Sequence, residues 1–397
     1  MKSKLIELYY NTFPNIEKFY ANNGGKDFVV QLFLDKSNLL KKLSRIISPY
    51  FLYGTYRLFE PLISIFVVTG QFLNTLFLKK GNSRLAVDRV DRLYLNYAHL
   101  LKDRCRSAGI FEESVYWLKE PFTNVSIKGL EDKTVLSVFD VLKQKDFLRA
   151  YINSITAIFY VARHNPNHYI RRSYTAFEFY LTYYAVSMFP KETELVFANH
   201  IDRWALAFDN CPQKKKILVQ HGIETKAADW PVKLNTVTTL YAFNEELGCD
   251  VAKALLTHKP EYRFMKPTIE LVDDIDDKNY KVLIVCHPAA MRDKEEYLIS
   301  HLQQSNITIY AKTHYTTPDL SFYEDLAKRY RYHLITTKHF PKVNKLISYR
   351  STLVSEYEIC GIPALMYADH KNLDEIVEKV KSAADLYELK GNKEDEK

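Results

Sequence analysis

The amino-acid sequence predicts an α/β protein with two domains that follow a helical, aromatic-rich N-terminal extension. Short β-branched and apolar runs alternate with segments of helix length, which is the pattern of parallel strands joined by crossover helices. The alternation occurs twice, over residues 85–265 and 278–388, with a polar and acidic segment between the two parts. A length of 397 residues also fits two domains plus an extension.

The extension covers residues 1–84 and differs from the rest of the chain in composition. Residues 46–78 are mostly apolar and aromatic, and basic residues flank them on both sides. Within it, residues 61–78 approach the length of a membrane span, but Gln71 and Asn74 lie in the middle of this stretch, where a span is apolar. Three interpretations stay open: a buried helix pair, an anchor on the inner surface of the cytoplasmic membrane, and a true span.

The first domain, residues 85–265, is expected to contain a parallel sheet. Residues 133–187 are expected to form helices whose aromatic side chains, including Phe177, Phe179 and Tyr180, belong to the core. The expected strands are residues 92–95, 114–118, 195–198, 216–220 and 237–243.

A polar linker over residues 257–279 leads into the second domain, residues 278–388. Asp274 and Asp276 match an Asp-x-Asp metal motif, but their place in a linker favours a solvated loop. The final residues, 389–397, are charged and are expected to be disordered. The expected strands of this domain are residues 281–286, 306–312, 333–336 and 364–367, and its expected helices are residues 293–302, 320–330, 351–360 and 373–386.

Composition excludes several classes of site. The five cysteines are far apart, so they form neither a disulfide framework nor a Cys-x-x-Cys metal site, and a cytosolic protein with reduced thiols is expected. The chain has 11 glycines and neither a Gly-x-Gly-x-x-Gly nor a P-loop phosphate motif. The formal charge of +7 is spread evenly, so nucleic acid is not an expected partner. It suits an anionic small substrate or an anionic membrane surface.

Polar residues recur immediately after the expected strands in both domains. In open parallel sheets, ligands bind outside the carboxyl ends of the strands. Histidine is infrequent, yet several of its 12 copies fall at these positions, which predicts a polar cleft. The residues concerned are Asn199, His200, His221, Gly222, Asn244, His287, Pro288, Lys312 and His314.

The segment from Tyr349 to Pro363 carries a second pattern. Ser351 or Thr352 is a good helix N-cap, and the free N–H groups of a helix start attract a phosphate. Thr352 and Glu356 are four residues apart and therefore share one helix face, so Glu356 is placed to meet ribose hydroxyls. The alternative is an N-capped amphipathic helix with no ligand.

Three motifs in order carry a resemblance to a known group of enzymes. They are Gln220-His221-Gly222, Lys312-x-His314, and Ser-Thr-Leu-Val-Ser-Glu followed after four residues by Gly-Ile-Pro, residues 351–363. Together they resemble GT-B glycosyltransferases, and within these the bacterial capsule and lipopolysaccharide transferases of the Kdo or sialic-acid type. Teichoic-acid glycerophosphotransferases are more distant. The resemblance covers residues 195–367, plus a first strand near Arg92, and departs at Tyr315, where the group has proline.

The resemblance implies two Rossmann-like domains that face each other across a cleft. It also implies a nucleotide-activated sugar donor, a polysaccharide or lipid-linked glycan acceptor, and neither a metal nor another cofactor. Lys312, His314 and the Ser351–Thr352 helix start would bind the donor phosphates, and Glu356 its ribose. His287 and Arg350 would add donor contacts. His221 would be the general base, with Asp202 and His200 in reserve.

Alternatives of other classes also stay open. On the same fold, the chain would be a polyol-phosphate transferase of the teichoic-acid type or a nucleotide-sugar epimerase. A third alternative is a non-catalytic subunit of a polysaccharide-assembly complex.

Overall fold

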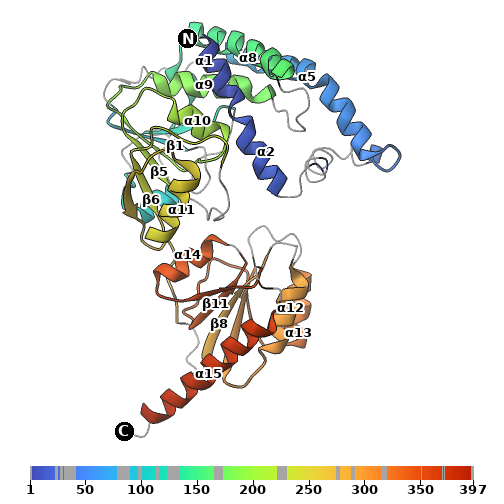
Figure 1. The fold of residues 1–397 in the computed structure, drawn as a ribbon, viewed down its shortest axis with the longest axis vertical. Coiled ribbons are helices and arrows are strands. Elements are labelled where there is room, and N and C mark those ends of the chain that lie inside the picture. Colours follow the sequence, from blue (N-terminus) through green and yellow to red (C-terminus); the bar gives the residue numbers. More distant parts are fainter. Residues whose placement is uncertain are drawn as a thin grey trace. The chain divides into compact units, whose positions relative to one another are not determined.

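The structure is a computed structural model. It describes residues 2–22, 26, 30, 42–77, 90–96, 101–112, 116–122, 135–164, 173–220, 230–273, 278–287, 291–313, 320–349, 351–368, 370 and 372–394. The chain divides into two compact units, Met1–Phe264 and Met265–Lys397. Each unit contains one sheet, and every neighbouring pair of strands in both sheets is parallel (Figure 1).

Unit 1 contains a seven-stranded sheet with the order β3-β2-β1-β4-β5-β6-β7. Strands β4 and β5 are almost entirely buried, as parallel strands are when helices cover both faces of a sheet. The strands are β1 (Arg92–Asn96), β2 (Tyr116–Lys119), β3 (Val135–Leu136), β4 (Glu194–Phe197), β5 (Lys216–Val219), β6 (Thr239–Ala242) and β7 (Glu261–Phe264).

Strand β7 corrects the prediction of a linker over residues 257–279. It pairs with β6 along its whole length. The linker interpretation missed it because β7 is an edge strand with mostly exposed side chains, so it lacks the apolar signal of the inner strands.

The helices of unit 1 are held by local caps and by burial. Ser137 and Asp140 form a capping box at α7, and the Asn244 side chain caps α11. The helices that follow the extension are α6 (Leu101–Ser107), α7 (Val138–Val141), α8 (Gln144–His164), α9 (Ala176–Ser187), α10 (Arg203–Asp209) and α11 (Glu245–Leu255), with a 3₁₀ turn η3 at Ser173–Thr175.

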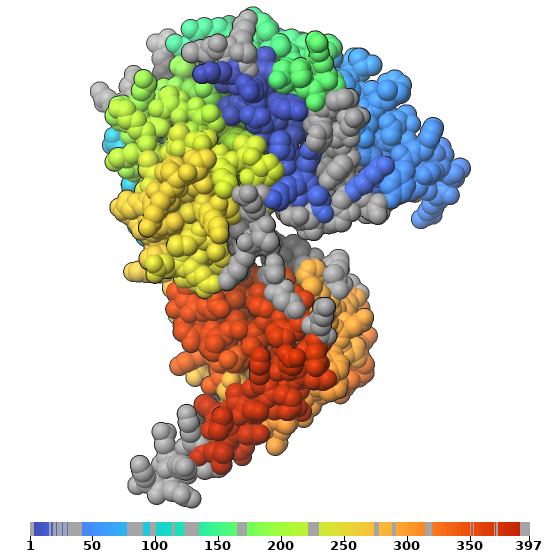
Figure 2. Space-filling view, in the orientation of Figure 1, coloured from blue at the N-terminus to red at the C-terminus, as the bar shows by residue number. Residues whose placement is uncertain are grey.

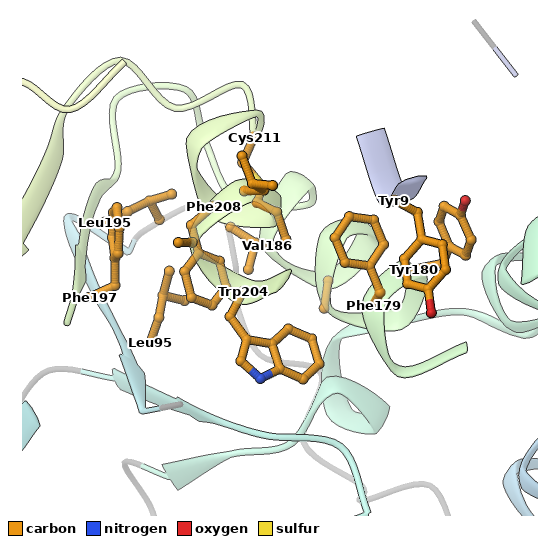
Figure 3. Packing of buried hydrophobic residues seen from close by; sticks show 14 of the residues in the cluster. Tyr9, Leu95, Phe179, Tyr180, Val186, Leu195, Phe197, Trp204, Phe208 and Cys211 are labelled. Carbon is orange, nitrogen blue, oxygen red and sulfur yellow. The ribbon is translucent and has the colours of Figure 1, made fainter. Parts of the chain in front are cut away.

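The first helices of the chain, α1 (Lys2–Tyr10) and α2 (Phe13–Asn22), belong to the core of unit 1. Tyr9 is fully buried, and its ring lies 5.5 Å from that of Phe13 and 5.2 Å from that of Phe179. Its hydroxyl is 3.0 Å from Oγ1 of Thr175. Figure 3 shows Tyr9 beside Phe179 and Tyr180. The prediction that the aromatic residues of α9 are core is therefore confirmed.

The apolar run of the extension forms one continuous helix, α5 (Pro49–Phe77), with Pro61 inside it. It packs against α8, α9 and η3. The predicted buried helix pair is therefore wrong, because a single helix is formed and most of its large apolar side chains are exposed.

Unit 2 contains a five-stranded sheet with the order β10-β9-β8-β11-β12. Helix α15 continues to Glu394, beyond the predicted start of a disordered tail at residue 389. The elements are β8 (Tyr280–Val285), α12 (Arg292–His301), β9 (Ile307–Lys312), α13 (Ser321–Arg329), β10 (His333–Ile335), β11 (Lys345–Ser348), α14 (Thr352–Ile359), β12 (Ala364–Met366) and α15 (Asp374–Glu394). The predicted α/β class is confirmed.

Buried Asp209 at the end of α10 should be important for the stability of unit 1. Its Oδ1 accepts hydrogen bonds from N and Oγ1 of Thr236, both at 2.8 Å, and its Oδ2 accepts one at 2.9 Å from N of Asn235. We expect Asp209→Ala to leave the backbone N–H groups of Asn235 and Thr236 unpaired and to cost about 3 kcal/mol of unfolding free energy, measured by chemical denaturation. Glu192→Ala, which removes a fully exposed ion pair with Lys214, should not change stability, and equal effects would contradict this account.

Candidate functional site

The order of the strands fixes one switch point in each sheet. In unit 1 the chain builds β1, β2 and β3 in one direction and then β4 to β7 in the other, so the switch lies between β1 and β4. In unit 2 the same reversal lies between β8 and β11. At such a point the loops diverge to opposite sides and leave a crevice at the carboxyl ends of the strands.

Three predicted polar residues follow β4 at the switch point of unit 1. Asn199 is buried and donates from Nδ2 to Oδ2 of Asp202 at 2.8 Å. The other oxygen, Oδ1, accepts from N of Trp204 and N of Ala205, both at 3.0 Å. The Asp202 carboxylate is therefore the N-cap of α10. This structural role accounts for both of its oxygens.

The other catalytic residues predicted in unit 1 have different outcomes. His200 is buried, and its Nδ1 lies 3.1 Å from the carbonyl oxygen of Ala198. That local contact holds the ring against its own strand end. His221, the predicted general base, lies outside the described residues, so its role stays a prediction.

The structure adds a charged cluster that the sequence did not reveal. Glu120 directly follows β2, and its carboxylate lies 3.4 Å from Nη2 of Arg203. The same guanidinium lies 3.0 Å from Glu178 on α9. Glu178 also accepts a hydrogen bond at 3.0 Å from Nε2 of Gln71 on α5. A hydrogen-bonded chain thus connects the carboxyl edge of the sheet to α5.

Burial changes the acidity of this cluster. It raises the pKa of Glu120 above its ordinary value, and the Arg203 charge opposes that rise. It raises the pKa of Glu178 in the same way. A glutamate with a raised pKa at the end of a strand can exchange a proton closer to neutral pH. Glu120 lies two residues after the expected strand 114–118, and this position was the signal in the sequence that could have identified it.

In unit 2 the residues His287, Tyr349 and Ser351 lie at the switch point between β8 and β11. His287 follows β8 and Tyr349 follows β11, and their rings meet edge to face with centroids 4.9 Å apart. Ser351, two residues after Tyr349, is the N-cap of α14, and its Oγ accepts from N of Leu353 at 3.3 Å. The three side chains are half-buried. The structure therefore places two predicted donor-binding residues, His287 and Ser351, at one switch point.

Glu295 on α12 holds the backbone at this switch point. It is fully buried, and its Oε1 accepts hydrogen bonds from N of His287 at 2.6 Å and from the Tyr367 hydroxyl at 2.7 Å. Its Oε2 accepts a hydrogen bond at 2.6 Å from the Tyr323 hydroxyl. Burial raises the pKa of both tyrosines well above the ordinary value, so they remain donors. Glu295 therefore fixes the backbone from which the His287 ring projects.

Lys312 ends β9, next to β8 in the sheet. Its Nζ donates to the carbonyl oxygen of Thr337 and lies 4.8 Å from the centroid of the Phe340 ring. Burial lowers the pKa of this amino group to about 8. A partly desolvated ammonium lacks water ligands, which favours an anionic partner.

Glu356 has partners that the sequence did not suggest. It is buried, and its oxygens accept hydrogen bonds from N and Oγ1 of Thr268, both at 2.6 Å. A ribose would have to compete with Thr268 for this carboxylate, so the predicted ribose role stays a prediction. Arg350, His314 and the side chain of Thr352 lie outside what the structure describes.

Two further features concern ligands. Among the described residues, no group of three or more His, Cys, Asp or Glu side chains is placed to hold a metal ion. A pocket of about 400 Å³ in unit 1 is lined by residues that include Arg149, Tyr184 and Asn210. Asn210 ends α10 and leads into β5, so this pocket lies at the amino ends of the strands, away from the switch point.

Comparison with known proteins gives distant structural similarities only. No protein-family model matches the chain, and no curated protein matches it. A UDP-GlcNAc 2-epimerase from Neisseria meningitidis bound to UDP-GlcNAc aligns at 11% identity and TM-score 0.36, over 72% of this chain and 84% of that one. A UDP-N-acetylglucosamine 2-epimerase from Rickettsia bellii aligns at 10% identity and TM-score 0.33, over 69% of this chain and 77% of that one. The wall teichoic acid polymerase TagF aligns at 12% identity and TM-score 0.38, over 81% of this chain and 79% of that one.

Each of these three proteins is an enzyme by its name. At these identities and TM-scores the similarities decide neither the activity nor the substrate of this chain.

The lowered pKa of Lys312 gives a direct test. The pKa of Lys312 is about 8 in the folded chain and 10.5 ordinarily. Between pH 8 and pH 10.5 the unfolded chain therefore binds more protons at this residue than the folded chain does. The free energy of unfolding then increases as the pH rises through this range. We expect an amine-selective reagent, followed by mass spectrometry, to label Lys312 with a midpoint near pH 8. Exposed Lys328, whose pKa is raised by Asp325, should react only at higher pH. A shared midpoint would contradict the desolvated environment.

Proposed function

We propose that this protein is a glycosyltransferase of the GT-B type. It would move a sugar from a nucleotide-activated donor to a growing bacterial surface polysaccharide or glycolipid, without a metal and without another cofactor. The observation that carries the proposal is the convergence of His287, Tyr349 and the Ser351 N-cap at the switch point of unit 2.

The donor phosphates would bind at the start of α14. The first N–H groups of a helix have no partner within the helix and carry a partial positive charge, which favours a phosphate. His287 lies at the adjacent strand end and can donate from its ring to a phosphate oxygen. Lys312 and His314 would neutralise the charge that develops on the leaving nucleotide when the bond to the sugar breaks.

Lys312 suits the role of neutralising the leaving nucleotide because of the surroundings of its ammonium group when no ligand is bound. A carbonyl oxygen and an aromatic ring hold its ammonium, and among the residues that the structure describes no carboxylate forms an ion pair with it. An arriving phosphate would favour the charged form and raise the pKa from about 8. Nucleotide binding should therefore move the labelling midpoint of Lys312 to higher pH.

The acceptor hydroxyl would be deprotonated in the first domain. His221 is the first candidate for this base, since an unperturbed histidine pKa near ~6.5 suits proton transfer at neutral pH. Glu120 is the second, because burial raises its pKa and it lies at the carboxyl edge of the same sheet. Asp202 is the weaker choice, since both of its oxygens cap α10 or bind Asn199.

Donor binding can be tested with a panel of nucleotide sugars scored by thermal shift, in which a ligand raises stability as ln(1 + [L]/Kd). We expect one nucleotide class to stabilise the wild-type protein. His287→Ala and His314→Ala should each weaken binding of that nucleotide at least about tenfold, or ~1.4 kcal/mol.

His333→Ala is the matched control, because it changes an exposed histidine at the amino end of β10. It should bind as wild type does. Failure of every nucleotide to stabilise the protein would favour the non-catalytic alternative. Two observations distinguish the other enzymes on the same fold. Release of CMP with phosphate retained in the polymer identifies a polyol-phosphate transferase, and a reaction that needs no acceptor identifies a nucleotide-sugar epimerase.

The general base can be assigned with kcat measured across pH. We expect His221→Ala to keep its fold and to lose at least about 100-fold in kcat, while Glu120→Gln retains most of its rate. Glu112→Gln, an exposed glutamate that pairs with Arg92, is the control. A near wild-type rate for His221→Ala, with a large loss for Glu120→Gln, would assign the base to Glu120 instead.

A further inference from the structure

Helix α5 presents an apolar face to its surroundings. No exposed side chain between Pro49 and Phe77 carries a charge, and the large exposed ones are almost all aliphatic or aromatic. Phe66 and Phe77 are 77% and 83% exposed. Leu58, Phe59, Leu62, Phe66, Leu73 and Phe77 recur at helical spacing along this face. In Figure 2 the helix forms an outer edge of unit 1.

The opposite face of α5, which packs on unit 1, buries polar groups together with apolar side chains such as Val68 and Phe72. Glu60 is buried and accepts hydrogen bonds from Oγ of Ser64 at 2.7 Å and from N of Ser173 at 2.9 Å. Thr69 contacts the Tyr151 hydroxyl at 3.1 Å, and Gln71 donates to Glu178 at 3.0 Å. The helix thus reverses part of the arrangement of a water-exposed amphipathic helix: it buries polar groups against unit 1 and keeps most of its large apolar side chains on the exposed face.

This reversal has a physical consequence. A water-exposed helix keeps its apolar stripe inside, because apolar surface in contact with water costs about 25 cal/mol per Å². Over 29 residues α5 exposes an apolar strip about 43 Å long. A contiguous patch of this size marks a contact with another molecule or with a membrane.

The charges beside the helix identify the partner. Lys42 and Arg45 precede it, and both are exposed. Between residues 41 and 84 the only acidic residue is Glu60, which is buried, while the basic residues are Lys41, Lys42, Arg45, Arg57, Lys79, Lys80 and Arg84. An apolar strip between basic segments fits a surface of anionic lipids, whose acyl chains accept the strip and whose headgroups attract the lysines and arginines.

We propose that α5 docks this protein on an anionic membrane surface and lies in the plane of the interface. Length and composition alone would also allow α5 to cross a bilayer. Its buried stripe, however, runs from Tyr53 to Thr75 and fixes the whole helix to unit 1. A spanning helix would have to break the contacts of Glu60, Thr69 and Gln71. The proposal does not rest on the transferase activity, because lipid binding needs no nucleotide.

The test is flotation of the full-length protein with phosphatidylcholine vesicles that contain or lack phosphatidylglycerol. We expect binding to the anionic vesicles, at least tenfold weaker binding for the double variant Leu62→Asp with Phe66→Asp, and weaker binding for Lys42→Glu with Arg45→Glu. Leu386→Asp, at a 61% exposed leucine on α15, is the matched control and should bind as wild type does. Circular dichroism and thermal melting confirm that each variant is folded.

Several outcomes would overturn the proposal. One is a wild-type protein that does not float, and another is a Leu62/Phe66 variant that floats as wild type does. Resistance of the bound protein to extraction by alkaline carbonate would indicate a spanning helix instead. If the wild type is a dimer by light scattering without vesicles, does not float, and becomes monomeric in the Leu62/Phe66 variant, the strip is an interface between two copies.

Discussion

The parallel direction of all strands is the constraint from which the rest of this structure follows. Two neighbouring parallel strands need a connection that returns to the starting edge, so helices must cross the faces of each sheet. Those helices cover the strands on both sides, which explains why β4, β5 and β8 are almost wholly buried and mostly apolar. The carboxyl ends of the strands then collect at one edge, where polar side chains remain close to water.

This constraint explains how much of the fold the sequence could predict. Strands such as β8 and β9 could be predicted from the sequence, because burial on both faces of the sheet requires nearly continuous apolar runs. Ser351 could be predicted as an N-cap because capping depends on residues close together in the chain. The exposed edge strand β7 was not predicted, since its side chains lack the apolar pattern of an inner strand, and the exposed apolar face of α5 fitted only some of the alternatives left open.

The candidate site could be predicted only in part, for a related reason. Position after a strand is a local signal, and it identified His200, His287 and Lys312. Partners come from distant parts of the chain and leave no such signal. The pairing of Arg203 with Glu120 joins residues 83 positions apart, and that of Glu356 with Thr268 joins residues 88 apart. The sequence therefore suggested which polar residues follow a strand. It did not show which of them are already hydrogen-bonded or ion-paired to residues far away in the chain.

Three buried glutamates illustrate how this protein places charge. Glu60, Glu295 and Glu356 are each almost inaccessible to water, and each accepts hydrogen bonds from residues on other elements. A buried carboxylate without donors is strongly unfavourable, so each one selects a single arrangement of its neighbours. In this way Glu60 sets the orientation of α5, and Glu295 sets that of the loop after β8.

The connection from Gln71 through Glu178 and Arg203 to Glu120 has a consequence for how an acceptor would be found. It ties the helix proposed to rest on lipid to the edge of the sheet where an acceptor would bind. A transferase held in this way meets lipid-linked molecules by lateral diffusion in two dimensions. Its rate would then depend on the number of acceptors per unit area of membrane, and dilution of the surrounding solution would leave that rate unchanged.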